Sequence, residues 1–197
     1  NGINALIESF NKTSHIIETR SFLKQRIIAL ILTFILSILI VSSITLMVFG
    51  EVALDYLLKW GILKHKILYN LLEVVKWIIV LSLFFFGISF LYYMGPSRKM
   101  KYKFFSAGSI AATLLCLLVS FGFTYFVNHF GQYNKIYGSI GTLIVILLWI
   151  YFNSINLLIG FELNASIDSA SKKYKEHLKQ KELGSFKKNK IVAQYMV

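Results

Sequence analysis

Long apolar stretches alternate with short charged blocks along this chain. Among the runs without a charged residue are 27–50, 77–97 and 136–161. A helix of about 20 residues crosses a hydrocarbon layer of about 30 Å, because it rises about 1.5 Å per residue. Another apolar stretch begins near Ser106. The pattern predicts an all-α, polytopic membrane bundle with four spans at about residues 27–49, 74–95, 106–127 and 138–162.

The segments before and between the first two spans have patterns of their own. Apolar or small residues of the first segment share one helical face: Ile3, Leu6, Ile7, Phe10, Ser14 and Ile17. Polar residues lie largely opposite: Glu8, Asn11, Lys12 and His15. Residues 1–20 therefore predict an amphipathic helix, either in the membrane interface or packed under the bundle. In residues 51–76, Gly61 predicts a break between two short helices at the far interface.

Polar residues of the fourth span fall on one arc of the helix. At 100° per residue this arc contains Gly138, Thr142, Trp149, Asn153, Asn156, Gly160 and Asn164. Amides buried in hydrocarbon cost free energy unless they find partners, so the arc is expected to face other helices or a wet cavity. Two interpretations remain open, helix–helix packing and the lining of a pathway.

The third span carries a similar stripe of small and polar residues. Its members are Ser109, Thr113, Cys116, Ser120 and Thr124, with Gly108 and Ala112 at the edge. Small residues let helix backbones approach closely, so this face is expected to pack against a neighbouring helix. We treat Ser109, Thr113 and Ser120, together with the arc of the fourth span, as a candidate polar pathway or packing surface.

The composition supports a membrane protein. The chain is 56% hydrophobic and 16% aromatic, and its net charge is +12. Sixteen of the 21 Lys and Arg residues lie in residues 1–26, in the loop at 98–103 and in residues 166–197. The positive-inside rule therefore predicts that both termini are cytoplasmic and that the loops at 51–76 and 128–136 face out.

The basic blocks predict contacts with lipids. Four cations lie within six residues and are expected to contact anionic headgroups: Arg98, Lys99, Lys101 and Lys103. No nucleic-acid partner is expected, because the blocks alternate with membrane spans. Residues 1–165 are assigned to a helical membrane domain, and residues 166–197 to a basic cytoplasmic tail, a short helix that frays into disorder.

The ionisable residues do not predict an enzyme. The nine acids are dispersed and the four histidines lie in separate polar segments, so no catalytic, metal or cofactor site is expected. Glu162 ends the fourth span; it is either an interfacial partner of Arg98 or Lys99 or a gating or proton-linked group. Lys76 is expected to reach toward the interface near Glu73.

Several motifs in order carry a family resemblance. They are LYYMGPSRKMKYKFFSAGSIAATL, the turn Tyr137-Gly138-Ser139, and LLWIYFNSINLLIGFELNA, which ends with Gly160, Glu162 and Asn164. In the first segment, Asn11 and Arg20 stand in matching places. Over nearly its whole length the chain resembles the YihY/BrkB family of bacterial inner-membrane proteins, also called UPF0761. It departs at Ser106-Ala107-Gly108, where the family often has Pro before Gly, and it lacks the earliest of the family's roughly six spans.

The resemblance implies a fold and an inner-membrane location more firmly than an activity. The family has carried ribonuclease, virulence and transport labels, the ribonuclease one formerly and wrongly. We expect a transport or lipid- and envelope-related permease component, and the alternative is a structural or scaffolding membrane protein. A ribonuclease is the alternative that the residues favour least. Membrane lipids, a second copy of the chain and the missing spans are the expected partners, and the chain is interpreted as a C-terminal fragment or a short member.

Overall fold

The computed structural model describes residues 1–13, 17–60, 66–97, 104–129 and 139–195, and the side chains to residue 184 apart from those of Lys66, His129 and Ser139. These ranges contain five helices and no strand: α1 (Gly2–Thr13), α2 (Phe22–Lys59), α3 (Lys66–Met94), α4 (Ala107–His129) and α6 (Ser139–Tyr195). In the described part of the chain, four helices are long and apolar enough to cross a membrane: α2, α3, α4 and α6. The all-α polytopic bundle predicted from the sequence is confirmed.

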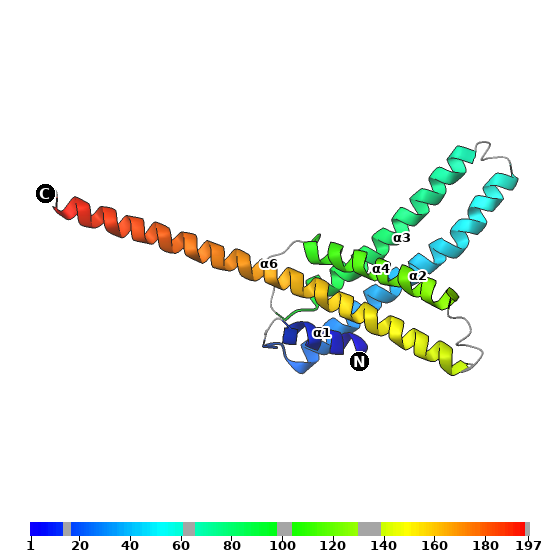
Figure 1. The fold of residues 1–197 in the computed structure, drawn as a ribbon, viewed down its shortest axis with the longest axis horizontal. Coiled ribbons are helices and arrows are strands. Elements are labelled where there is room, and N and C mark those ends of the chain that lie inside the picture. The colour runs from blue at the N-terminus through cyan, green and yellow to red at the C-terminus, as the bar shows by residue number, and fades with distance from the viewer. Residues whose placement is uncertain (14–16, 61–65, 98–103, 130–138, 196–197) are drawn as a thin grey trace.

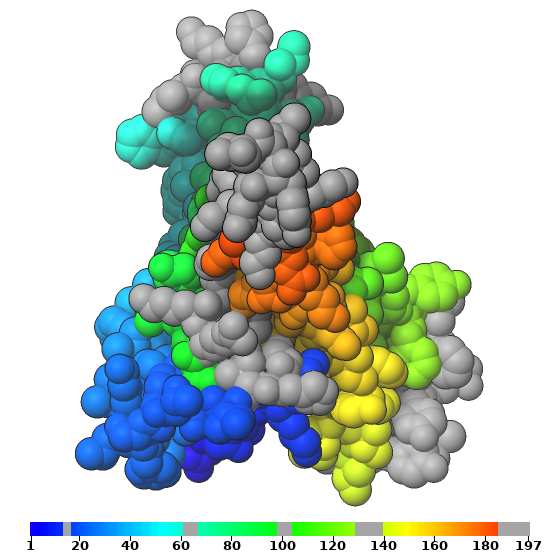
Figure 2. All heavy atoms as spheres, turned by 90° about the vertical axis from the view of Figure 1, so that its left-hand side faces the viewer, coloured from blue at the N-terminus to red at the C-terminus, as the bar shows by residue number. Residues whose placement is uncertain are grey.

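The four long helices form two antiparallel hairpins (Figure 1). Helices α2 and α3 pack along each other, and α4 packs along α6. The hairpins meet near α1 and diverge toward their tips, so the bundle has the outline of a V. In Figure 2 the α2–α3 tip lies at the top, and the start of α6 lies at the lower right. We call the closed end of the V the α1 end and the open end the tip end.

Helix α1 packs under the point where the hairpins meet. Ile7 and Phe10 are fully buried, and the Phe10 ring stacks on Phe161 of α6 at a centroid distance of 4.4 Å. Of the two expected placements, the structure has the one beneath the bundle. The predicted helix was too long, because α1 ends at Thr13 and Ile17 is 84% exposed. Asn11 was placed on the polar face, yet it is buried, because polar groups of neighbouring segments surround it.

Residues 51–76 do not form two short interfacial helices, which corrects the sequence prediction. Helix α2 continues through Lys59, and α3 begins at Lys66; Gly61 lies outside the described residues. Each helix simply extends beyond its apolar run, because no proline or glycine interrupts residues 51–59 or 66–76. Helix α3 ends at Met94, just before Pro96, which cannot donate a backbone hydrogen bond.

Helix α6 also differs from its prediction. Instead of a short helix that frays after the fourth span, one continuous helix runs from Ser139 to Tyr195 and projects far from the bundle (Figure 1). Its 57 residues correspond to a rod of about 85 Å at about 1.5 Å per residue. No glycine or proline occurs between Phe161 and Gly184, and Ala, Leu, Lys and Glu favour the helix there.

Candidate functional site

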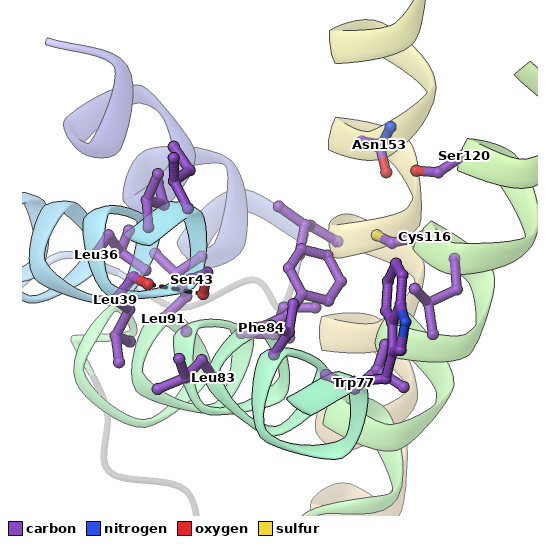
Figure 3. A pocket seen from close by; sticks show the side chains of 18 of the residues that line it. Leu36, Leu39, Ser43, Trp77, Leu83, Phe84, Leu91, Cys116, Ser120 and Asn153 are labelled. Carbon is purple, nitrogen blue, oxygen red and sulfur yellow. Dashed lines mark hydrogen bonds between the residues drawn. The ribbon is translucent and has the colours of Figure 1, made fainter. Parts of the chain in front are cut away.

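A cleft lies between the two hairpins, inside the V. Its volume is about 440 Å³, and all four long helices line it. Helix α2 contributes residues between Leu36 and Ile44, and α3 contributes residues between Trp77 and Leu91. These walls are aliphatic and aromatic apart from Ser43, whose hydroxyl donates to the backbone oxygen of its own helix (Figure 3). The cleft is therefore an apolar space at membrane depth.

The opposite wall carries the polar side chains of the cleft. Cys116 and Ser120 of α4 and Asn153 of α6 lie close together and face one another (Figure 3). Ser120 Oγ accepts a hydrogen bond of 3.3 Å from Trp149 Nε1, and Asn153 Nδ2 donates to the Trp149 backbone oxygen at 2.8 Å. Among the described lining residues of the cleft none is charged, so this wall offers neutral hydrogen-bonding groups.

Asn156 lies one turn from Asn153, deeper in the bundle. It is 6% exposed and its side chain lies beside the Cys116 thiol. Its Nδ2 group has no hydrogen-bond partner within the described structure, and the same holds for the Ser89 hydroxyl of α3. A buried amide donor without a partner costs about 1–3 kcal/mol. The predicted arc of α6 therefore includes at least one buried polar group, the Asn156 amide, whose hydrogen-bonding capacity is not fully used.

The α1 end of the arc is satisfied by hydrogen bonds. Asn164 is 1% exposed; its Oδ1 accepts from the Gly108 N–H at 2.7 Å, and its Nδ2 donates to Ser106 Oγ at 2.8 Å. Ser106 precedes α4, and its Oγ also accepts from the Ser109 N–H at 3.2 Å. The first N–H groups of a helix lack partners within the helix. Asn164 and Ser106 together cap α4, and they join it to α6.

Small residues bring α4 and α6 together beside this cap. A Cβ atom on Gly108 would lie 2.0 Å from the backbone oxygen of Gly160, and one on Gly160 would lie 2.6 Å from the Cβ of Ala112. Two helices approach this closely only where side chains are absent or small. The stripe predicted on the third span thus includes the packing surface of the hairpin, with Ser109 and Thr113 buried in it.

Aromatic side chains close the V at its α1 end. Tyr92 of α3 is 1% exposed, and its hydroxyl donates to the Leu157 backbone oxygen of α6 at 2.6 Å. The Phe10 ring meets Tyr92 edge-on at 5.6 Å and stacks on Phe161. One hydrogen bond and three rings therefore connect the first hairpin, the second hairpin and α1.

A polar cluster holds α1 to the end of α3. Glu18 pairs with Arg20 through a contact of 2.8 Å and accepts from Asn11 Nδ2 at 2.6 Å. Asn11 Oδ1 accepts from the Ser97 N–H at 3.0 Å, and Arg20 Nη2 donates to the Gly95 backbone oxygen at 2.9 Å. The hydrogen bond from Arg20 holds the pKa of Glu18 below its ordinary value of 4.5, although partial burial opposes this shift. The carboxylate is therefore stabilised in its charged form.

Lys76 does not pair as predicted. Its Nζ lies 3.3 Å from Glu51 Oε1 of α2, and Glu73 takes no part in this contact. The lysine is 6% exposed, and its stem packs on Gly50, where a Cβ atom would lie 3.0 Å away. Glycine at that position leaves room for the buried stem. The pair crosses the α2–α3 hairpin where the uncharged run of α2 ends.

The remaining predicted site residues lie in different surroundings: some are exposed, some are buried and some fall outside the described residues. Glu162 is exposed on α6, whereas Gly160 is buried. The proposed partners of Glu162 and the whole basic block fall outside the described residues: Arg98, Lys99, Lys101 and Lys103. Asn153 and Ser120 line the cleft, whereas Ser109, Thr113 and Asn164 lie in the packed contact between α4 and α6. The arc predicted as one surface has a packed part and an open part.

A second hollow adjoins the cleft toward the tip end. Its volume is about 400 Å³, and it shares two lining residues, Ser120 and Trp149, with the cleft. The other lining residues are Phe123, Thr124, Val127 and Asn128. This lining mixes hydroxyl and amide groups with aromatic rings, and the described residues that form it carry no charge.

Several functional contacts were missed at the level of sequence. The cleft wall of α2 gave no signal, because apolar residues that face a cleft and apolar residues that face lipid have the same composition. Nothing in the sequence indicated that Tyr92 links the two hairpins through its hydrogen bond to the Leu157 backbone oxygen. The match of Asn11 and Arg20 to family positions was the one available sign of the cluster around Glu18.

Comparisons with known proteins agree with this architecture. The family model described as Virulence factor BrkB matches residues 1–184. A putative ribonuclease-like protein YfkH of Bacillus subtilis is 29% identical over 87% of this chain and 62% of its own length. A UPF0761 membrane protein of Pseudoalteromonas translucida is 35% identical over 41% of this chain and 27% of its own length.

A further UPF0761 membrane protein, from Idiomarina loihiensis, is 26% identical over 60% of this chain and 42% of its own length. The chain thus spans less than two thirds of the length of each of these relatives. No solved structure matches it. The family model covers nearly the whole sequence, and several helices have the length and hydropathy of membrane spans. This chain therefore belongs to the BrkB family of multi-pass membrane proteins.

Proposed function

We propose that this protein is a component of a membrane permease and that the cleft between the hairpins receives the apolar chain of a lipid-like solute. The observation that carries the proposal is the cleft itself, which has about 440 Å³ of space, is lined by four membrane helices and has no charged residue among its described lining. Its volume lies in the range of about 300–1,000 Å³ that is typical of small-molecule sites.

The lining favours a hydrocarbon chain over a hydrated solute. A charged or strongly polar molecule entering this space would lose its hydration, and the walls of α2 and α3 would return little of that free energy. An acyl chain loses nothing comparable, because it exchanges the bilayer interior for an equally apolar surface. Its recognition then depends on close packing and on the polar groups of the α4–α6 wall.

By the proposed orientation, the protein lies in the inner membrane with the α1 end on the cytoplasmic side. Lys12, Arg20, Lys24 and Arg26 belong to this end, and the extension of α6 adds several lysines. The cleft would then open toward the external leaflet, while Tyr92, Phe10 and Phe161 close the cytoplasmic end.

A second candidate is a scaffold without transport, and the cap on α4 favours it. Asn164 donates a hydrogen bond to Ser106, and the two side chains accept hydrogen bonds from N–H groups in the first turn of α4. Such paired polar groups are expected where structural helices pack without water between them. The two candidates make different predictions for the cleft. A permease component binds a lipid chain there, whereas in a scaffold the space carries no ligand. Neither candidate is an enzyme.

The cleft can be tested with a photoreactive palmitoyl lipid and the protein in nanodiscs. Ile40 lines the cleft and is 58% exposed, so Ile40→Trp fills the space without displacing packed atoms. Ile38 is 49% exposed on the same helix and does not line the cleft, so Ile38→Trp is the matched control. We expect Ile40→Trp to remove labelling of α3 and α4 cleft residues and Ile38→Trp to leave it unchanged. Equal labelling in both variants would refute the permease proposal.

A further inference from the structure

The cleft and the second hollow have different chemistry. The walls of α2 and α3 are almost wholly apolar, whereas the second hollow adds Thr124 and Asn128 to the shared Ser120 and Trp149. Figure 3 shows Asn153 and Ser120 facing each other on the polar wall of the cleft. Polar lining is therefore concentrated along α4, from the cleft toward the tip end.

The order of the two hollows matches the order of groups in an amphiphile. Ser120 and Asn128 are eight residues apart on α4, which corresponds to about 12 Å along the helix axis. A chain seated in the cleft would thus carry its polar group about one headgroup's length closer to the tip end. Trp149, whose ring lies at the junction and donates to Ser120 Oγ, faces both spaces. Tryptophan suits such a position because its indole has an apolar body and a polar N–H.

The polar lining also limits the charge of the ligand. The described residues that line the second hollow offer one amide and two hydroxyls beside aromatic and aliphatic surface, without Lys, Arg, Asp or Glu. Among these described residues an anionic phosphate would find no charged partner, whereas hydroxyl and ester groups can exchange neutral hydrogen bonds with all three.

We propose that the two hollows form one binding site for a neutral amphiphile, with its acyl chain in the cleft and its hydroxylated head in the second hollow. This inference rests on the proposed function, because it names the class of lipid that the cleft would receive. Ser120, Thr124 and Asn128 determine the preference for a neutral head, and the walls of α2 and α3 accept the chain.

The test compares three photoreactive probes with the same chain length in nanodiscs: a monoacylglycerol, a lysophosphatidic acid and a plain alkane. The wild-type protein should be labelled most strongly by the monoacylglycerol. The double variant Ser120→Ala/Asn128→Leu should lower the preference for this probe over the alkane by about threefold to tenfold for each lost hydrogen bond. Ser154→Ala is the matched control, because Ser154 Oγ donates to its own helix and does not line either hollow.

The outcomes separate the two proposals. If Ile40→Trp blocks all three probes but the wild type prefers the lysophosphatidic acid or shows no preference, the neutral-head site is refuted and the permease proposal stands. If Ile40→Trp blocks none of them, both proposals fail. A loss of monoacylglycerol preference in the double variant, with alkane labelling retained, supports the site.

Discussion

Asn164 provides the sharpest test of the division between packing and pathway. Asn164→Leu keeps approximately the volume of the side chain and removes its bonds to the Gly108 N–H, 2.7 Å, and to Ser106 Oγ, 2.8 Å. A typical hydrogen bond contributes about 1 kcal/mol net, and a buried N–H left without a partner costs about 1–3 kcal/mol. We therefore expect the free energy of unfolding to fall by about 2–4 kcal/mol.

Asn153→Leu is the matched control on the same helix. The Asn153 amide donates to the backbone oxygen of Trp149, four residues earlier, and faces the cleft. Its loss orphans no group on another helix, so the free energy of unfolding should change by less than about 1 kcal/mol. The measurement is equilibrium unfolding by steric trapping in bicelles. If the two variants were equally destabilised, the distinction between a packed and an open part of the arc would be wrong.

Three further predictions concern the α1 end. In a thermal unfolding assay, Gly108→Ala should destabilise the protein by about 1–3 kcal/mol or more, because the added Cβ would lie 2.0 Å from the Gly160 backbone oxygen. Gly122→Ala is the control and should be neutral or stabilising, because a Cβ there would meet nothing within 4 Å. Phe10→Ala should cost about 3–5 kcal/mol, because the ring is fully buried, whereas Phe22→Ala, at a 75% exposed position, should cost little; similar unfolding temperatures would contradict this. Because the pKa of Glu18 is lowered on folding, its stabilisation should be fully present above its unfolded pKa of about 4.5 and lost as the pH falls through the folded pKa. A pH titration of unfolding should show a smaller acid loss in Arg20→Gln, and an unchanged profile would refute the role of this pair.

The membrane spans were predictable because few sequences other than spans keep more than 20 residues free of charge. The predicted C-terminal ends of the second and third spans lie within two residues of the ends of α3 and α4, and Pro96 accounts for the end of α3. The first charged residue after an apolar run did not mark the end of α2 or α6, because both helices continue beyond it. A helix that leaves the hydrocarbon can continue in water where no glycine or proline interrupts it, as residues 51–59 of α2 and residues 161–183 of α6 do.

The candidate site was predictable only in part. Helical periodicity shows which residues share one face of a helix, but it does not show which other helix or cleft that face meets. It placed Asn153, Asn156 and Asn164 on one side of the fourth span. It could not say that Asn164 caps α4 while Asn153 faces a cleft, because this depends on how far the hairpins diverge. The partner of Lys76 was missed for a similar reason: Glu51 is distant in sequence, and only the α2–α3 register brings it close.

The central claim, an open apolar cleft between two hairpins, can be tested by spin-label accessibility on α4. A nitroxide at Leu117, which lines the cleft, would be compared with one at lipid-facing Leu118 and one at buried Ala112, each in a Cys116→Ala background in nanodiscs. We predict that the Leu117 label collides with oxygen nearly as often as the Leu118 label and rarely meets a water-soluble nickel chelate. Oxygen accessibility at Leu117 as low as that at Ala112 would mean that the hairpins are closed against each other, which contradicts the cleft.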